Sequence, residues 1–418
     1  MLLLSDGSDL EGVENVLNIK YIKLLRICMR MLTAWPYKYV GEKESRRMIF
    51  FRLYTLSLEV CCWTPGILYI YNYANKLSFF EMGNTYITLL MNTIAILRLE
   101  MIFRKTYYTT VGMFIKELHL FNHRNRSEFA MKMHLLVHKM SHFYTMYLFF
   151  MMILGIVMFN ALPLCNNIMS GAFSGNAGVN VTFEHAVYYS LPFDYKTNFN
   201  GYLAVATFNV YISCICSSIF CIFDLLISLM VFHIWGHLRI LVHDFETFPG
   251  PQNKEYYTKE EKEKARVRLR DIIKNHQMVL GALSNLIDTF GAHLAMYYGF
   301  HQSSCCLLML ECSPMDAKSL LRYGLLTMLV FQQMIQISVV FEMVGAMPEY
   351  IINAVYSMPW EYMDKSERQV VEVVLRQVQR PMSLKALSIV DVGCKTMVTI
   401  MKTSCTYFIM LRTMATDE

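Results

Sequence analysis

Charged residues are scarce in this sequence. Asp, Glu, Lys and Arg make up 17% of its 418 residues, whereas soluble globular proteins carry roughly 25%. Hydrophobic residues reach 55%. The shortage of charge therefore excludes an ordinary soluble domain and predicts an integral membrane protein.

Signatures of catalysis and of cofactor binding are also missing. The sequence has no His-Glu-x-x-His, no Gly-x-Ser-x-Gly, no phosphate-binding glycine loop and no ligands at metal spacing, so an enzyme, a cofactor and a bound metal are not expected. The basic residues of 253–277 are offset by Glu260, Glu261 and Glu263, which argues against nucleic acid as a partner. No basic leader precedes the first apolar stretch, so that stretch is expected to act as its own insertion signal.

The cysteines show no disulfide framework. Most of the 12 lie within apolar stretches, where small buried thiols are ordinary packing residues. Cys165 and Cys312 lie at the predicted outer ends of such stretches, and a single disulfide between them is one interpretation.

The sequence does contain seven apolar stretches long enough to cross a bilayer. They cover residues 48–72, 84–103, 142–163, 200–235, 276–311, 319–347 and 390–412. The fourth and fifth are longer than a membrane requires and should project from it, because a helix rises about 1.5 Å per residue. Charges inside the first two, at Arg52, Glu59, Arg98 and Glu100, are expected to face the bundle or an interface rather than lipid.

The distribution of Lys and Arg between these stretches predicts the orientation. The N-terminal segment and the second, fourth and sixth loops are rich in them, whereas Lys76, Lys196 and Lys318 are the single basic residues of the first, third and fifth loops. Basic loops stay in the cytoplasm, so the N-terminus is predicted inside and the C-terminus outside. This orientation is opposite to that of a G-protein-coupled receptor, which is the alternative by span number.

Two glycosylation sequons test this orientation. Asn180 falls in the third loop, which is predicted to be extracellular, and is the expected glycosylation site. Asn125 falls in the second loop, which is predicted to be cytoplasmic, and should stay unmodified.

Two segments outside the apolar stretches have helical patterns. The N-terminal "IKYIKLLRICMRML" is amphipathic and would lie on the inner membrane face or pack against the bundle. In the sixth loop, Asp364 and Glu367 resemble a capping box and Pro381 ends the pattern. A valine face at Val370, Val371, Val374 and Val378 must be buried, either on the inner ends of the fourth and fifth spans or on a neighbouring subunit.

The last apolar stretch is divided into a polar and an apolar side. Lys395, Thr399, Lys402, Thr403, Thr406, Met410, Thr413 and Met414 fall within an arc of about 120° on a helical wheel, which we call the polar stripe. Met397, Ile400, Met401, Phe408 and Leu411 lie opposite, together with Ser404. A lysine at the bilayer centre costs ~3 kcal/mol unless it faces water or a partner.

The polar stripe has two interpretations. It could be buried against other helices by hydrogen bonds, or it could line a pore. In the second case the pore and gate residues are Thr399, Thr403, Thr406, Met410, Thr413 and Met414, with the two methionines forming an apolar constriction. One stripe cannot enclose a pore, so several subunits would have to surround a common axis.

The same region resembles the insect odorant receptor family. "TIMKTSCTYFIMLR" is similar to the family pattern "ILKTAYSYFAVLR" and matches it at Lys402, Thr403, Tyr407, Phe408 and Leu411. His276-Gln277 and "AVYSMPW" at 354–360 are further similar features, whereas "LSIVDVGCKTM" at 387–397 departs from the family pattern. Related gustatory receptors carry Gln-Phe where this chain has Thr413-Met414, which leaves a gustatory-type channel as the less favoured alternative.

This resemblance implies the architecture and the function. The family consists of all-α, seven-transmembrane subunits of tetrameric, ligand-gated, non-selective cation channels in the plasma membrane of olfactory sensory neurons. The implied partners are odorant co-receptor subunits and a small volatile odorant, with membrane lipid around the bundle. The fourth loop is much shorter than that of the co-receptor, so this chain resembles an odorant-tuned subunit.

The chain then divides into four regions. Residues 1–47 form a cytoplasmic N-terminal segment, 48–347 hold spans one to six, 348–389 form a cytoplasmic anchor region, and 390–418 hold the pore-lining seventh span and a short extracellular tail. The family's ligand pocket lies in the outer half of the bundle. The corresponding candidates are Tyr86, Leu89, Thr93, Met151, Leu154, Met158, Phe208, Tyr211, Ile212, Tyr297, Tyr323 and Thr327.

Overall fold

The computed structural model describes residues 7–73, 79–173, 182–253, 256–312, 323–379, 385–386 and 390–416. Within these residues the regular secondary structure is helical, apart from a two-residue antiparallel pairing between β1 (Lys385–Ala386) and β2 (Val390–Asp391). The predicted all-α class is therefore confirmed for the described part of the chain.

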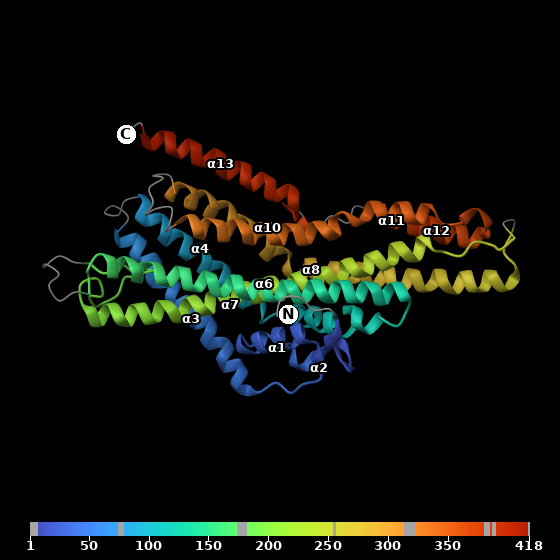
Figure 1. Cartoon of the computed structure of the whole chain (residues 1–418), viewed down its shortest axis with the longest axis horizontal. Coiled ribbons are helices and arrows are strands. Elements are labelled where there is room, and N and C mark those ends of the chain that lie inside the picture. Colours follow the sequence, from blue (N-terminus) through green and yellow to red (C-terminus); the bar gives the residue numbers. More distant parts are fainter. Residues whose placement is uncertain are drawn as a thin grey trace.

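Seven long helices coincide with the seven predicted spans. They are α3 (Arg46–Tyr73), α4 (Phe79–Met101), α6 (Glu128–Met169), α7 (Phe199–Glu246), α8 (Lys259–Glu311), α10 (Leu325–Gly345) and α13 (Cys394–Thr416). In Figure 1, α6, α7 and α8 run along the long axis of the molecule, and α13 lies at one edge beside α10. The helices α7, with 48 residues, and α8, with 53 residues, are long, as the sequence predicted.

Not every long helix is equally apolar. Among the described residues, α3, α6, α7 and the segment Leu325–Tyr356 are long and apolar enough to cross a membrane, and a bent pair, Thr85–Met101 with Lys105–His123, would be a fifth. Polar residues interrupt the apolar character of α8 and α13, as with His301 and Gln302 in α8. Such interruptions are tolerated where a helix faces protein or water rather than lipid.

The second loop contains more structure than the sequence indicated. It folds into α5 (Lys105–Met113), a π-helical turn η3 (Phe114–Leu118) and a short 3-10 turn η4 (Leu120–His123). The chain bends by 78° between α4 and this segment. The third span also begins earlier than predicted, at Glu128, because the Ser127 hydroxyl caps it by accepting a hydrogen bond from the Ala130 amide at 3.0 Å.

The N-terminal segment packs against the bundle. It comprises η1 (Ser8–Leu10), η2 (Val16–Asn18), α1 (Lys20–Met31) and α2 (Tyr37–Val40). Tyr21, Ile22 and Leu25 of α1 are buried, and α1 contacts α6 and α7. Of the two placements that its amphipathic pattern allowed, the inner membrane face and the bundle, the structure shows packing against the bundle.

The anchor region forms as the sequence predicted, with one difference. It comprises α11 (Met347–Tyr356), η6 (Trp360–Tyr362) and α12 (Lys365–Val378), and α12 begins with the predicted capping box at Asp364. Val371, Val374 and Val378 are buried, but Val370 is 39% exposed, so the predicted valine face is narrower than four residues.

The valine face lies beside other helices of the same chain. The helix α12 packs on α11, which in turn packs on α7. The buried valines belong to the same apolar cluster as Ala265 and Leu269 near the start of α8. Ion pairs also connect α12 to this part of α8: Lys262 pairs with Asp364, and Arg266 lies 3.6 Å from Glu367.

The remaining expectations concern single side chains. Arg52, Glu59 and Arg98 are buried within the bundle, and Glu100 pairs with Arg104 at the end of α4, so these charges lie where the sequence predicted. Both Cys165 and Cys312 are free thiols, and the allowed disulfide between them is absent.

Candidate functional site

A cavity lies between four of the long helices. Its walls come from α4, α6, α7 and α10, with Phe300 of α8 and with Val187 and Tyr189 of the segment that precedes α7. The space open to water-sized spheres is about 130 Å³, which is below the roughly 300–1,000 Å³ of drug-sized ligand sites, so the cavity suits only a small molecule. We call it the inner cavity.

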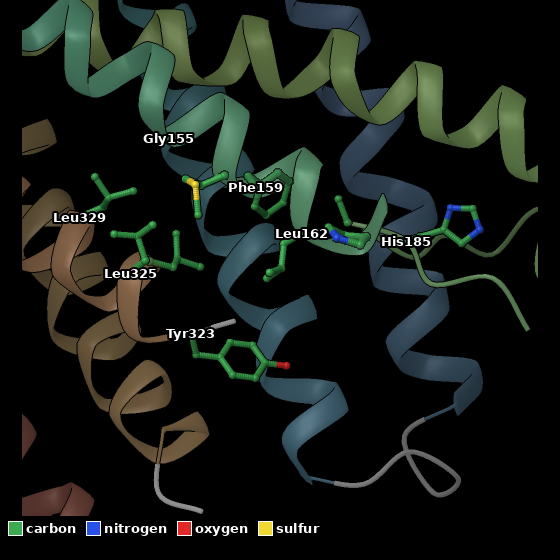
Figure 2. A pocket seen from close by; sticks show the side chains of 11 residues that line it. Gly155, Phe159, Leu162, His185, Tyr323, Leu325 and Leu329 are labelled. Atoms are coloured by element: carbon green, nitrogen blue, oxygen red, sulfur yellow. The ribbon is translucent and has the colours of Figure 1, made fainter. Parts of the chain in front are cut away.

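A second, smaller pocket adjoins the inner cavity and is shown in Figure 2. We call it the outer pocket, because it lies toward the end of α6 and the start of α10, which are predicted to be extracellular. Figure 2 shows Phe159 and Leu162 of α6 near Leu325 and Leu329 of α10. Four residues line both spaces, namely Gly155, Phe159, Leu326 and Leu329, so the two spaces lie on either side of the same side chains.

The walls of the inner cavity are mainly apolar with a few polar groups. Met91, Met151 and Phe220 are among the apolar contributors, and aromatic rings come from Phe159, Tyr189 and Phe300 as well. The polar groups are Thr88, Asn92, Ser213, Ser217, Asp224, Gln332, Gln333 and Gln336. An apolar cavity with few polar groups can bind a small organic molecule and fix its orientation.

A buried ion pair closes the deep end of the cavity. Arg98 of α4 donates to Oδ1 of Asp224 in α7 at 2.7 Å and to the Phe220 carbonyl at 2.9 Å. The hydroxyl of Tyr297 in α8 donates to Oδ2 of Asp224 at 3.0 Å. The Arg98 guanidinium lies 4.7 Å from the ring centroids of both Phe220 and Tyr297, where cation–π attraction adds to the ion pair. The carboxylate is thus fully satisfied by protein groups.

The structure brings some of the predicted ligand residues together. Met151 and Ile212 line the inner cavity, and Met158 and Tyr323 line the outer pocket. Tyr297 lies at the cavity floor, where it holds Asp224 rather than lining the space itself. These five residues remain candidates for ligand contact or for support of it.

Other predicted ligand residues face elsewhere. Leu89 packs beside Gly66 of α3. Thr93 accepts a hydrogen bond from Trp63 Nε1 at 3.0 Å. These two residues of α4 therefore contact the first span instead of the cavity.

The rest lie at the surface or in neighbouring contacts. Tyr211 shares a hydrogen bond of 3.1 Å with Tyr54 of α3, and Phe208 packs against the Tyr189 ring outside the cavity. Thr327 donates to the Tyr323 carbonyl at 2.7 Å. Tyr86 is exposed, and Leu154 is half-buried and lines neither space.

The ligand residues predicted from the sequence include none of these polar groups of the inner cavity. Asp224 is an acidic residue inside an apolar stretch, and the three glutamines of α10 interrupt another, which are both signals of an inward-facing position. Asn92 and Ser217 carry no such signal, because single small polar residues are common in membrane helices.

The polar stripe of α13 faces away from the rest of the chain. Lys395, Thr399, Lys402, Thr406, Met410 and Thr413 are exposed, and Thr403 is half-buried. The threonine hydroxyls donate to carbonyls of their own helix, as Thr403 does to Thr399 at 2.7 Å. Within the described part of one chain, other helices therefore do not bury the stripe by hydrogen bonds.

The opposite face of α13 holds the helix to the bundle. Ile400 and Ser404 are buried, and Ser404 accepts a hydrogen bond from Gln302 of α8 at 3.3 Å. The side chain of Met414 and the whole of Asn180 lie outside the described residues. Among the residues that are described, no group of His, Cys, Asp and Glu could hold a metal ion.

The comparisons with known proteins agree with this architecture. A family model described as "7tm Odorant receptor" matches residues 78–405. No curated protein sequence matches the chain. The solved structure of the insect olfactory receptor OR5 from Machilis hrabei is similar over 94% of this chain and 97% of its own, with 15% identity and a TM-score of 0.77.

A second OR5 structure from Machilis hrabei, in complex with eugenol, is similar over 96% of this chain and 99% of its own, with 15% identity and a TM-score of 0.78. At this identity the likeness concerns the fold, whereas the family model covers most of the sequence. The chain therefore belongs to the odorant receptor family and has the fold of a solved insect olfactory receptor.

Proposed function

We propose that this chain is an odorant-tuned subunit that binds a small volatile molecule in the inner cavity. With an odorant co-receptor it opens a non-selective cation channel in the plasma membrane of olfactory sensory neurons. The observation that carries the proposal is the inner cavity itself, with its mainly apolar walls and few polar groups, beside the outer pocket. The eugenol complex of OR5, which has the same fold, is consistent with such a ligand.

The polar stripe of α13 supports the channel part of the proposal. Its lysines and threonines are exposed in a single chain, which is unfavourable in contact with lipid. In a tetramer with this helix innermost, the stripe would line an aqueous path and Met410 would lie near the outer constriction.

The connection between α7 and α8 supports the subunit type. Only residues 247–258 join Glu246 to Lys259, so the fourth loop is short, as expected for an odorant-tuned subunit rather than a co-receptor.

With the N-terminus in the cytoplasm, Asn180 would be extracellular. A glycan on Asn180 and none on Asn125, measured by mobility shift of Asn→Gln variants, would support this orientation, and the reverse pattern would contradict it.

The test is ligand-evoked current in cells that express this chain with a co-receptor. We expect inward current on application of an active volatile, with no requirement for guanine nucleotide in the patch. No current across a broad volatile panel, with the protein present at the cell surface, would contradict the proposal.

A matched pair of variants tests the cavity. Met151→Trp fills the inner cavity from α6, whereas Ile153→Trp places the same ring on an outward position that is 58% exposed. We expect the first variant to lose the response and the second to retain it, at equal surface expression. Equal responses of the two variants would exclude the inner cavity as the ligand site.

A further inference from the structure

The wall that α10 forms in the inner cavity changes from apolar to polar along its depth. Leu326 and Leu329 line the part shared with the outer pocket, and Gln333 and Gln336 follow on the next turns of the same face. The wall formed by α6, from Leu148 to Phe159, carries no polar side chain. A ligand that lies along α10 therefore meets hydrocarbon at one end and hydrogen-bonding groups at the other.

Three of the deep polar groups have unused hydrogen-bonding capacity. Asn92, Ser217 and Gln333 come from three different helices, α4, α7 and α10, and all line the inner cavity. In the part of the chain that the structure describes, the side chains of Ser217 and Gln333 make no hydrogen bond, and Asn92 has only a 4.0 Å contact from the Cys216 thiol. Polar groups that face a cavity and have no protein partner are available to a ligand or to water.

The neighbouring glutamine provides a contrast. Gln332 donates to the hydroxyl of Tyr147 and to the side-chain oxygen of Gln336. Its amide is therefore already engaged within the protein, whereas that of Gln333, one residue further along, is available. Not every polar side chain of α10 is therefore free to bond a ligand.

The deep end of the cavity also lacks free charge. Among the described lining residues, Asp224 is the single Asp, Glu, Lys or Arg, and its two oxygens accept from Arg98 and Tyr297. A ligand ammonium would compete with a guanidinium for this carboxylate, and a ligand carboxylate would face it. Burying either ion without a partner is strongly unfavourable, so the cavity favours an uncharged ligand.

We infer that the ligand class of this receptor is the uncharged volatile alcohols and phenols. The hydroxyl lies among Asn92, Ser217 and Gln333, and the hydrocarbon extends past Gly155 and Phe159 toward the outer pocket. Amide and hydroxyl side chains both donate and accept, and a ligand hydroxyl does the same, whereas an ether or ketone only accepts. This inference rests on the proposed function, because it assigns the chemistry of the same cavity.

The first test compares ligands of one carbon skeleton. The panel contains a primary alcohol, its methyl ether, the alkane, the carboxylate and the ammonium analogue. Binding is measured by displacement of the apolar fluorophore N-phenyl-1-naphthylamine from the purified full-length receptor, and gating is measured by current in cells with a co-receptor. We expect the alcohol to be at least tenfold more potent than each analogue, and equal potency of alcohol and alkane would overturn the inference.

The second test removes the polar groups while keeping side-chain volume. Asn92→Leu and Gln333→Met should each lower the potency of the alcohol about tenfold and leave that of the alkane unchanged. The control Leu329→Ala should lower alcohol and alkane alike, because it removes only apolar contact. An alcohol preference that survives in both polar variants would contradict the placement of the hydroxyl.

The two readouts separate this inference from the proposed function. Alcohol-selective displacement of the fluorophore without any current would support the ligand class and contradict the channel. Current evoked by volatiles with no preference for the hydroxyl would support the channel and overturn the ligand class. Failure of every compound in the panel to displace the fluorophore would also overturn the ligand class.

Discussion

Arg98 of α4 and Asp224 of α7 form a buried ion pair, 2.7 Å between Nη2 and Oδ1, at the deep end of the inner cavity. The pair joins the second span to the fourth, and Tyr297 connects it to the fifth. Because Asp224 also lines the cavity, the group that holds three helices together is in reach of any ligand that fills the space. Movement of these helices and occupancy of the cavity are therefore expected to be linked.

The first prediction concerns the stability of this pair. Asp224→Ala leaves the Arg98 guanidinium buried without its carboxylate, and we expect the free energy of unfolding to fall by about 3–5 kcal/mol. The double variant Arg98→Met, Asp224→Leu removes both charges and should recover a large part of this loss. Thermal unfolding of the four proteins in detergent gives the double-mutant cycle, and additive losses in the double variant would show that the two charges are not coupled.

The second prediction concerns the link between α12 and α8. Glu367 is buried, accepts a hydrogen bond from the Asp364 amide at 3.2 Å and lies near Arg266. Glu367→Ala removes the capping box and the ion pair together and should lower the free energy of unfolding by about 1 kcal/mol. The control Glu372→Ala removes an exposed pair with Arg376 on the same helix and should change it by less than about 0.5 kcal/mol.

The third prediction separates the two faces of α13. Ile400→Ala empties a position that is 6% exposed and should lower the free energy of unfolding by about 2–5 kcal/mol. Met410→Ala changes a side chain that is 47% exposed in one chain, so unfolding of the single chain should be unaffected. If α13 lines the pore, Met410→Ala should instead raise the ligand-independent current, and an unchanged current would argue against a constriction at this residue.

The fourth prediction concerns pH and the segment that lines the outer pocket. Burial lowers the pKa of His185, with Lys196 acting in the same direction, while the hydrogen bond to the Tyr195 carbonyl at 3.0 Å opposes the shift. That bond requires a proton on Nε2, and the buried Nδ1 has no partner among the described residues. A second proton would therefore place an unpaired charge inside the segment.

The sign of the pH effect follows from this shift. In the unfolded chain the pKa of His185 is about 6.5. Below this pH the unfolded chain binds a proton on His185 that the folded protein does not bind. The free energy of unfolding therefore falls as the pH decreases from about 6.5 toward the lowered pKa. We expect ligand potency and thermal stability to decrease between external pH 7 and 5. His185→Gln should show a smaller decrease, and an identical pH profile in the variant would exclude His185 as the titrating group.

Much of the helical architecture was predictable from local patterns. The seven long helices coincide with apolar runs that are visible in the sequence, and the start of α12 follows from a capping box that involves only Asp364 and Glu367. The division of α13 into two sides is a consequence of helical periodicity, so the face that holds Ile400 and Ser404 could be identified in advance. These features depend on residues close to one another in the chain.

The lining of the cavity was not predictable in the same way. Tyr211 and Ile212 are adjacent, yet Ile212 lines the inner cavity and Tyr211 contacts Tyr54 of α3. Successive residues of a helix point about 100° apart, so a small error in the rotation of α7 exchanges a cavity position for a contact between helices. Hydropathy does not determine that rotation when all sides of a helix are apolar.

The sequence alone thus determined the class of protein, the order of the long helices and the polar character of the last one, because each depends on composition or on spacing along the chain. Only the tertiary structure decided that Asn92, Ser217 and Gln333 share one cavity and that Arg98 meets Asp224, 126 residues away. Those relationships depend on how α4, α7 and α10 pack and rotate against one another, which requires the contacts of the whole bundle.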